Sequence, residues 1–139
     1  MRIEIPKEMK LVHEMHMPIR WGDMDAFGHV NNTVYFRYME QARVEWITSL
    51  GYDVAPGDES MLMINGFCNF YQQLAYPGEL ILKTSIGTMG RSSMDVYTSM
   101  SLTTEPDTVV AIGGATMVWV DLKTNQSAPW PEHVLSKLR

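Results

Sequence analysis

The chain has 139 residues, of which 45% are hydrophobic, and a formal net charge of -5 at pH 7. This length suits one domain with one core, and we expect a single domain over residues 1–139. The chain has no cluster of Lys or Arg, which argues against nucleic acid as a partner. The longest mostly apolar stretch, residues 109–120, is shorter than the roughly 20 residues of a membrane-spanning helix. We therefore expect a cytoplasmic protein with no membrane partner and no signal peptide.

Residues 11–21 alternate between apolar and polar side chains and predict a first strand. His13 and His16 lie on opposite faces of this strand because they are an odd number of positions apart. We therefore do not expect them to share a metal.

The segment of residues 23–35, DMDAFGHVNNTVY, combines two acids, a glycine, a histidine and two asparagines ahead of an amphipathic stretch. The first N–H groups of a helix have no acceptor within the helix, and its dipole places partial positive charge there. A carboxylate beside such a helix start is a plausible catalytic arrangement, because the free amides can stabilise an oxyanion.

The segment allows other interpretations. A calcium loop beginning at Asp23 fails, because Phe27 and Val34 occupy positions that need oxygen ligands. The spacing also matches no transition-metal signature, so we expect no metal. The residues alone leave open a structural role, in which the two acids hold a turn, Gly28 supplies a positive φ, and Asn31 or Asn32 caps the helix.

The next element is a helix from Asn31 to about Leu50. Apolar side chains recur at helical spacing, a polar stripe lies opposite, and Gly51 is a natural stop. A loop containing Pro56 and Gly57 follows the helix.

Four strand-like runs follow, at residues 61–74, 79–88, 92–103 and 108–121, separated by turn signals. We interpret them as an antiparallel meander. The last run is apolar on both faces, so we expect the second face or a sheet edge to meet another copy of the chain. Within it, Gly113 and Gly114 predict a bulge or a close backbone approach. Cys68, the only cysteine, is expected to be a small core residue, and the tail around Trp130 a surface segment followed by a short turn or helix.

Residues 20–43 resemble the active-site segment of the 4-hydroxybenzoyl-CoA thioesterase-like family of hotdog-fold acyl-CoA thioesterases. That family has an aromatic strand end, then Asp-x-Asp-x-x-Gly-His-Val-Asn-Asn, a Tyr-rich helix start and Glu-x-Ala-Arg. This chain has Trp21, the run from Asp23 to Asn32, Tyr35 and the run from Glu40 to Arg43. Periodicity alone predicts only an α+β fold with an antiparallel sheet. The resemblance implies a hotdog fold, in which a sheet of about five strands wraps around one long helix, and assembly into a homodimer or homotetramer.

The resemblance also implies a reaction: hydrolysis of an acyl-CoA thioester to a carboxylic acid and free coenzyme A, without a cofactor. It makes Asp25 the catalytic residue, as nucleophile or general base. The amides of Val30, Asn31 and Asn32 would polarise the carbonyl. The flanking residues are Asp23, which would hold the turn, Gly28, His29, which would orient the loop or a water, and Tyr35 and Glu40. Arg91, Ser92 and Ser93 are expected near the coenzyme A phosphates, with an ordinary hairpin turn as the alternative.

Two alternative functions remain. A hydroxyacyl-thioester dehydratase of the same fold needs an acid and a histidine across the substrate, and His29 lies only four residues from Asp25. A non-catalytic acyl-thioester binding module would not need Asp25 at the helix entrance.

Overall fold

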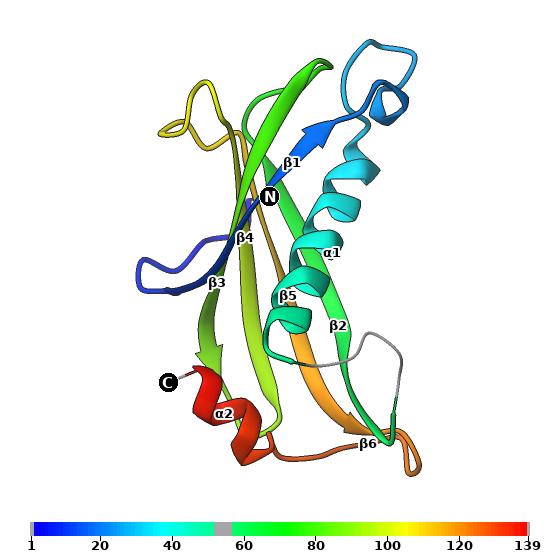
Figure 1. Cartoon of the computed structure of the whole chain (residues 1–139), viewed down its shortest axis with the longest axis vertical. Helices are drawn as coiled ribbons and strands as arrows, with labels where there is room; N and C mark the ends of the chain where they lie inside the picture. The colour runs from blue at the N-terminus through cyan, green and yellow to red at the C-terminus, as the bar shows by residue number, and fades with distance from the viewer. Residues whose placement is uncertain (1, 52–56, 139) are drawn as a thin grey trace.

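The computed structural model describes residues 2–51 and 57–138 of the chain. In these ranges the strands are β1 (Lys10–Ile19), β2 (Glu59–Phe70), β3 (Gly78–Met89), β4 (Ser93–Leu102), β5 (Ala111–Asp121) and β6 (Gln126–Ser127). The helices are α1 (Asn32–Ser49) and α2 (Glu132–Leu138), and a 3-10 turn (Trp21–Asp23) lies between β1 and α1. Figure 1 shows α1 lying along one face of a curved sheet, nearly in line with the strands. The α+β architecture is therefore the one expected.

The long helix α1 forms where the sequence predicted it. Its N-cap is Asn31, whose side chain accepts a hydrogen bond of 2.9 Å from the Thr33 N–H. One stripe of α1 is buried against the sheet, formed by Tyr35, Tyr38, Met39, Ala42 and Trp46. After α1, Gly51 adopts a φ of 91°, which favours glycine and ends the helix. The predicted Pro56 lies outside the described residues.

The strand order β1-β3-β4-β5-β2 corrects the predicted meander. Only β3, β4 and β5 are consecutive neighbours, whereas β2 pairs with β5 at the far edge and β1 pairs with β3. The turn signal at Tyr76, Pro77 and Gly78 marks the start of a strand correctly. It does not show that the chain crosses from β2 at one edge, past β5 and β4, before it forms β3, because strand pairing depends on distant residues. The result is that β2 is an edge strand.

Two clusters of buried side chains make up the core between the sheet and the helices. One cluster surrounds Tyr38 and Leu82 near the start of α1, and the other surrounds Trp46 and Trp119 near its end. The second cluster includes Trp130, Val134 and Leu138, so the prediction that the tail around Trp130 is a surface segment is wrong. The centroids of the Trp130 and Trp119 rings lie 5.7 Å apart. Burying two large apolar rings against each other stabilises the fold.

The predicted close approach at Gly113 and Gly114 is confirmed. A Cβ atom at Gly113 would lie 2.1 Å from the Met39 sulfur and 2.7 Å from the Phe67 carbonyl oxygen. A Cβ atom at Gly114 would meet the rings of Phe67 and Tyr97. Glycine at position 113 lets α1 lie directly against β5, and glycine at position 114 makes room for the Phe67 and Tyr97 rings.

Candidate active site

The loop before α1 is held by its own backbone. The Asp25 N–H donates to the His29 carbonyl at 2.9 Å, and the Gly28 N–H donates to the Asp25 carbonyl at 3.0 Å. Gly28 has a φ of 80°, so the expected positive φ is confirmed. A backbone bridge between Met24 and Val30 closes the loop. The tight loop places residue 25 beside the first turn of α1.

The Asp25 carboxylate is half-buried and held by two contacts. One oxygen accepts a hydrogen bond of 2.9 Å from the Phe27 N–H, and the other accepts one of 3.3 Å from the Asn31 side-chain amide. Because Asn31 also caps α1, the cap fixes the carboxylate relative to the helix start. Each carboxylate oxygen can accept more than one hydrogen bond, so both contacts leave Asp25 able to act on a further group.

The three helix-start amides of Val30, Asn31 and Asn32 are not equivalent. The Val30 N–H donates to the Leu74 carbonyl at 2.8 Å, and the Asn31 N–H donates to the Asp23 carbonyl at 3.0 Å. Among the residues that the structure describes, the Asn32 N–H has no acceptor. Of the three predicted oxyanion donors, this arrangement leaves the Asn32 amide for an incoming oxygen.

Asp23 has a different environment from Asp25. One of its oxygens accepts hydrogen bonds from the Tyr38 hydroxyl at 2.7 Å and from the Arg20 N–H at 3.0 Å, and its side chain is 14% exposed. Burial alone would raise the pKa of Asp23, but the contacts with Tyr38 and Arg20 outweigh it and hold the pKa below its usual value. The contacts of Asp23 are those of a carboxylate that holds the chain in place.

A cavity of about 400 Å³ opens beside Asp25. Its lining includes His29 and Val30 from the loop, Tyr35 from α1, and the segment 70–73 that follows β2. The Tyr35 and Phe70 rings meet edge to face at 4.9 Å, so α1 and the end of β2 are in contact there. Three of the residues named from the sequence, Asp25, His29 and Tyr35, therefore line one cavity. The sequence carries no signal for segment 70–73, because its place beside the loop depends on the edge position of β2.

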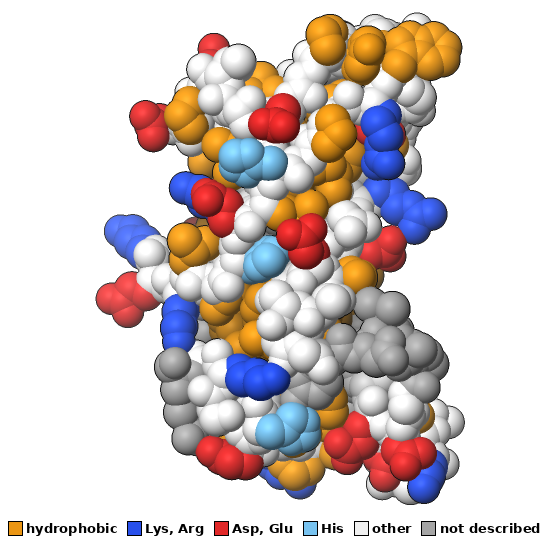
Figure 2. All heavy atoms as spheres, viewed as in Figure 1, with side chains coloured by type: hydrophobic (Ala, Val, Ile, Leu, Met, Phe, Trp, Pro, Cys, Tyr) orange, Lys and Arg blue, Asp and Glu red, His pale blue; other side chains and the backbone are white. Residues whose placement is uncertain are grey.

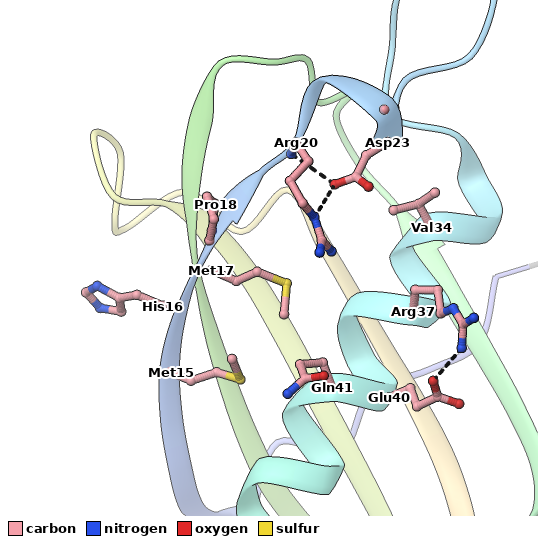
Figure 3. Close-up of a pocket in the computed structure, with 11 residues that line it drawn as sticks. Met15, His16, Met17, Pro18, Arg20, Asp23, Val34, Arg37, Glu40 and Gln41 are labelled. Atoms are coloured by element: carbon pink, nitrogen blue, oxygen red, sulfur yellow. Dashed lines mark hydrogen bonds and ion pairs between the residues drawn. The ribbon is translucent and has the colours of Figure 1, made fainter.

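A second cavity, of about 830 Å³, lies between β1 and α1 (Figure 3). Figure 3 shows Arg20 pairing with Asp23 at one end and Arg37 pairing with Glu40 on the helix. The Arg37–Glu40 distance is 2.8 Å. Glu40 therefore lies away from the Asp25 cavity, in contrast to Tyr35.

The turn with Arg91, Ser92 and Ser93 lies at the opposite end of the sheet from the loop of Asp25 (Figure 1). Ser93 pairs with Val118, which pairs with Leu62 near the start of β2, whereas the Asp25 cavity is at Phe70. Eight residues of extended chain span roughly 25 Å, so one chain does not bring this turn to Asp25. The carbonyls of Arg91 and Ser92 accept hydrogen bonds from the Trp130 and Trp119 N–H groups.

Some other features of the described part of the chain bear on chemistry. Cys68 is half-buried, and burial raises the pKa of its thiol to about 11, so it is a thiol and not a thiolate at neutral pH. In residues 2–51 and 57–138 no group of three or more His, Cys, Asp or Glu side chains could hold a metal. Neither helix in those ranges has the length and apolarity needed to span a bilayer.

The surface around the loop is apolar at its tip. Trp21 and Phe27 are 73% and 88% exposed, and Figure 2 shows a hydrophobic group at the end of the molecule that carries this loop. Elsewhere on that face, charges of both signs are interspersed.

Comparison with known proteins identifies the family. The model of the thioesterase-like superfamily matches residues 19–138. The PA2801 protein from Pseudomonas aeruginosa, a candidate thioesterase, is 32% identical, with a TM-score of 0.89 over 94% of this chain and 100% of that one. Slr0204, a 1,4-dihydroxy-2-naphthoyl-CoA thioesterase from Synechocystis, shares the fold at 16% identity, with a TM-score of 0.81 over 90% of this chain and 93% of that one.

A curated relative is the acyl-acyl carrier protein thioesterase ATL3 of Arabidopsis thaliana, which is 30% identical over 94 residues. The match covers 66% of this chain and 48% of that protein, so the matched part spans about half of ATL3. The sheet that curves around α1 (Figure 1) is the architecture expected for the family whose model matches residues 19–138. The chain belongs to the thioesterase-like superfamily and has the hotdog fold.

Proposed function

We propose that this chain hydrolyses acyl-CoA thioesters, with Asp25 as the catalytic residue. The observation that carries the proposal is the Asp25 carboxylate, which faces an open cavity near the start of α1, where the Asn32 amide has no acceptor in the described part of the chain. Within the superfamily, the run from Asp23 to Asn32 supports a place in the 4-hydroxybenzoyl-CoA thioesterase-like family. Neither a metal nor a redox cofactor is part of the proposal.

In the proposed reaction, the thioester carbonyl oxygen accepts a hydrogen bond from the Asn32 N–H. Negative charge that develops on this oxygen is stabilised by the amide and by the positive end of the α1 dipole. Asp25 takes a proton from a water that attacks the carbonyl carbon, or attacks that carbon itself to form an anhydride that water then opens. In both routes the C–S bond breaks, the sulfur leaves as the thiolate and is protonated to free coenzyme A, and the acyl group leaves as a carboxylic acid.

His29 lines the same cavity as Asp25, and we propose that it orients the loop or a water molecule. This shared cavity is also the observation that favours the alternative, a hydroxyacyl-thioester dehydratase using Asp25 and His29 together. A dehydratase leaves the thioester intact and releases water, so the products separate the two reactions.

We further propose that the active protein is a homodimer or a dimer of dimers. β2 is an edge strand of twelve residues in which five consecutive residues, 62–66, are exposed, and residues 60–78 include no charged side chain. Edge strands of stable monomers usually carry charges, proline or a cover that blocks pairing with another chain. A second copy of β2 pairing antiparallel along this edge would satisfy the free backbone groups of both strands.

Such a dimer supports a role for Arg91. A two-fold axis between two antiparallel β2 strands places the Leu62 end of one protomer beside the Gly66–Phe70 half of the other. Because the Arg91 turn lies at the Leu62 end, each protomer would bring Arg91, Ser92 and Ser93 toward the Asp25 cavity of its partner. We propose that these residues bind the coenzyme A phosphates across the dimer.

The test is a panel of thioesters that includes linear, branched and aromatic acyl-CoAs and hydroxyacyl-CoAs. Free thiol is measured by a colorimetric reagent, and the acyl products are measured by mass spectrometry. Thiol release with a carboxylic acid product is expected. Loss of water without thiol release would show the dehydratase, and binding without either product would show a binding module. Either result would overturn the proposal.

A further inference from the structure

Arg43, on α1, has no counter-ion among the described residues. The side chain is half-buried and makes no hydrogen bond or ion pair with any residue in the described ranges. Burial lowers the pKa of the guanidinium, although the charge of Glu40 nearby opposes the shift. A guanidinium in a protein stays protonated even so. Removing a charge from water without giving it a partner costs free energy. An anion bound at Arg43 would therefore be stabilising.

Arg43 lines a cavity of about 360 Å³ between α1 and the edge of the sheet. The wall opposite the helix is formed by Met63, Gly66 and Gly114 and carries no charge. On the helix side the other charged residues are Arg37 and Glu40, which pair with each other at 2.8 Å. The cavity therefore carries one net positive charge, at Arg43, beside an apolar wall.

One end of this cavity lies close to the candidate active site. Thr33 lines it and bonds to the Asn31 side chain, which in turn bonds to Asp25. Along β2, the Asp25 cavity reaches Phe70 and the Arg43 cavity reaches Gly66 and Met63. Both cavities therefore lie between α1 and β2, one after the other along the strand.

The spacing along α1 limits what could connect the two cavities. Eleven residues separate Asn32 from Arg43, a rise of roughly 16 Å, and helical side chains point back toward the N-terminus. Suppose that the thioester carbonyl oxygen binds the Asn32 amide and that the far end of the acyl group carries an anion bound to the Arg43 guanidinium. The acyl chain that spans the distance between them would then have roughly four to six carbons.

We infer that the Arg43 cavity binds the distal carboxylate of a short dicarboxylic acyl group, so that the preferred substrates are monothioesters of dicarboxylic acids. The inference rests on the proposed function and names its substrate class. The carboxylate would pair with the guanidinium, and Met39 and Met63 would contact the methylene groups between the two ends. A neutral acyl chain of equal length would leave the charge of Arg43 unpaired.

The test compares acyl-CoAs in pairs of equal carbon number: butanoyl with succinyl, pentanoyl with glutaryl, and hexanoyl with adipyl. At the best length, kcat/KM should be at least about tenfold higher for the dicarboxylic member. Arg43→Met should reduce this ratio to near one, and Arg43→Lys should keep part of it. Lys83→Met, which removes an exposed cation on β3, is the matched control and should leave the ratio and both rates unchanged.

Two results would overturn the inference: equal kcat/KM within every pair, or an unchanged ratio in Arg43→Met. An unchanged ratio together with dissociation of an oligomer by Arg43→Met would mean that the anion is an acid of a second copy. If no thioester is hydrolysed, the proposed function fails separately. Calorimetry with two non-hydrolysable thioethers, S-carboxybutyl-CoA and S-pentyl-CoA, then decides the inference, because tighter binding of the carboxylate upholds it and equal binding overturns it.

Discussion

Two aspartates only two positions apart have different neighbours and are suited to different tasks. Asp23 accepts hydrogen bonds from Tyr38 and from the Arg20 backbone and holds the loop against α1. Asp25 accepts from the Phe27 backbone and the Asn31 cap and faces an open cavity. The family resemblance assigned these two tasks as an expectation, but the local sequence does not show the contact behind the role of Asp23, because Tyr38 lies 15 positions further along the chain.

Asp25→Asn should abolish most of the thioesterase activity and leave the fold intact. Asparagine keeps the size of the side chain and its carbonyl oxygen can still accept from the Phe27 N–H, but it is neither a base nor a nucleophile. A general base contributes on the order of 10² to 10⁴ to kcat, so a loss of this size is expected in steady-state assays. Circular dichroism should show an unchanged fold.

Asp23→Asn is the matched control for this change and should lower kcat less, since its carboxylate holds the loop. An Asp25 variant within about threefold of the parent rate would rule out the catalytic assignment, because this factor corresponds to only about 0.65 kcal/mol of barrier.

Tyr38→Phe should destabilise the protein in a pH-dependent way. The lowered pKa of Asp23 means that its carboxylate stabilises the fold above the unfolded-state pKa near 3.8, and that this contribution is lost as pH falls through the lowered value. Removing the Tyr38 hydroxyl should reduce the free energy of unfolding by about 1–3 kcal/mol at pH 7, as for other hydrogen bonds to charged groups. The difference from the parent should shrink at about pH 3, measured by urea titration.

Tyr97→Phe is the control, because its half-exposed hydroxyl has no hydrogen bond to the described residues. A Tyr38→Phe deficit that is equal at both pH values would show that Asp23 is not its source.

The amides at the start of α1 show what the residue pattern could predict. The cap at Asn31 and the turn at Gly28 follow from local preferences, and both are confirmed. The use of the Val30 amide by the Leu74 carbonyl depends on a residue 44 positions away. Local sequence therefore predicted the helix start but not which of its amides is unpaired.

At the scale of elements, the contact between α1 and β5 depends on Gly113. Gly113→Ala would place a methyl group against the Met39 side chain and the Phe67 carbonyl. The Met39 side chain can move, but the Phe67 backbone cannot do so without disturbing the β2–β5 pairing. We expect a loss of about 1–3 kcal/mol in the free energy of unfolding, as for other overpacked cores.

Gly22→Ala is the control for this change, because a Cβ atom there meets nothing within 4 Å. Its stability should stay within about 0.5 kcal/mol of the parent in the same urea titration. Parent-like stability of Gly113→Ala would show that the helix is not packed as closely as described.

The elements themselves were largely predictable, because helices and strands have local periodicity. The helix predicted at residues 31–50 forms at 32–49, and the strand predicted at 79–88 forms at 78–89. The pairing of β2 with β5 was not predictable, since it depends on residues 59–70 meeting residues 111–121. Because the position of β2 was not predictable, neither was the contribution of segment 70–73 to the lining of the candidate site.

At the scale of the whole molecule, the exposed edge of β2 predicts a homo-oligomer. The mass in solution should be at least twice the chain mass of 15.9 kDa, measured by light scattering at micromolar concentration. Ile64→Lys places a charge at a residue that is 64% exposed within this edge and should reduce the mass to that of one chain. Leu11→Lys, at a residue 55% exposed on the other edge strand, β1, should not change the mass. A stable monomeric parent would contradict the proposed assembly.

If each active site combines Asp25 of one protomer with Arg91 of the other, two defective variants should complement each other. Arg91→Ala alone should raise KM for acyl-CoA with kcat nearly unchanged, because a phosphate contact supports substrate and transition state alike. Asp25→Asn alone should be inactive. A mixed dimer of the two variants contains one site with both defects and one site with neither. Co-expression with two affinity tags isolates this mixed dimer, which should show the parent KM and about half the parent kcat per dimer. If Arg91 acted on the Asp25 of its own chain, no site in the mixed dimer would be intact and the raised KM would persist.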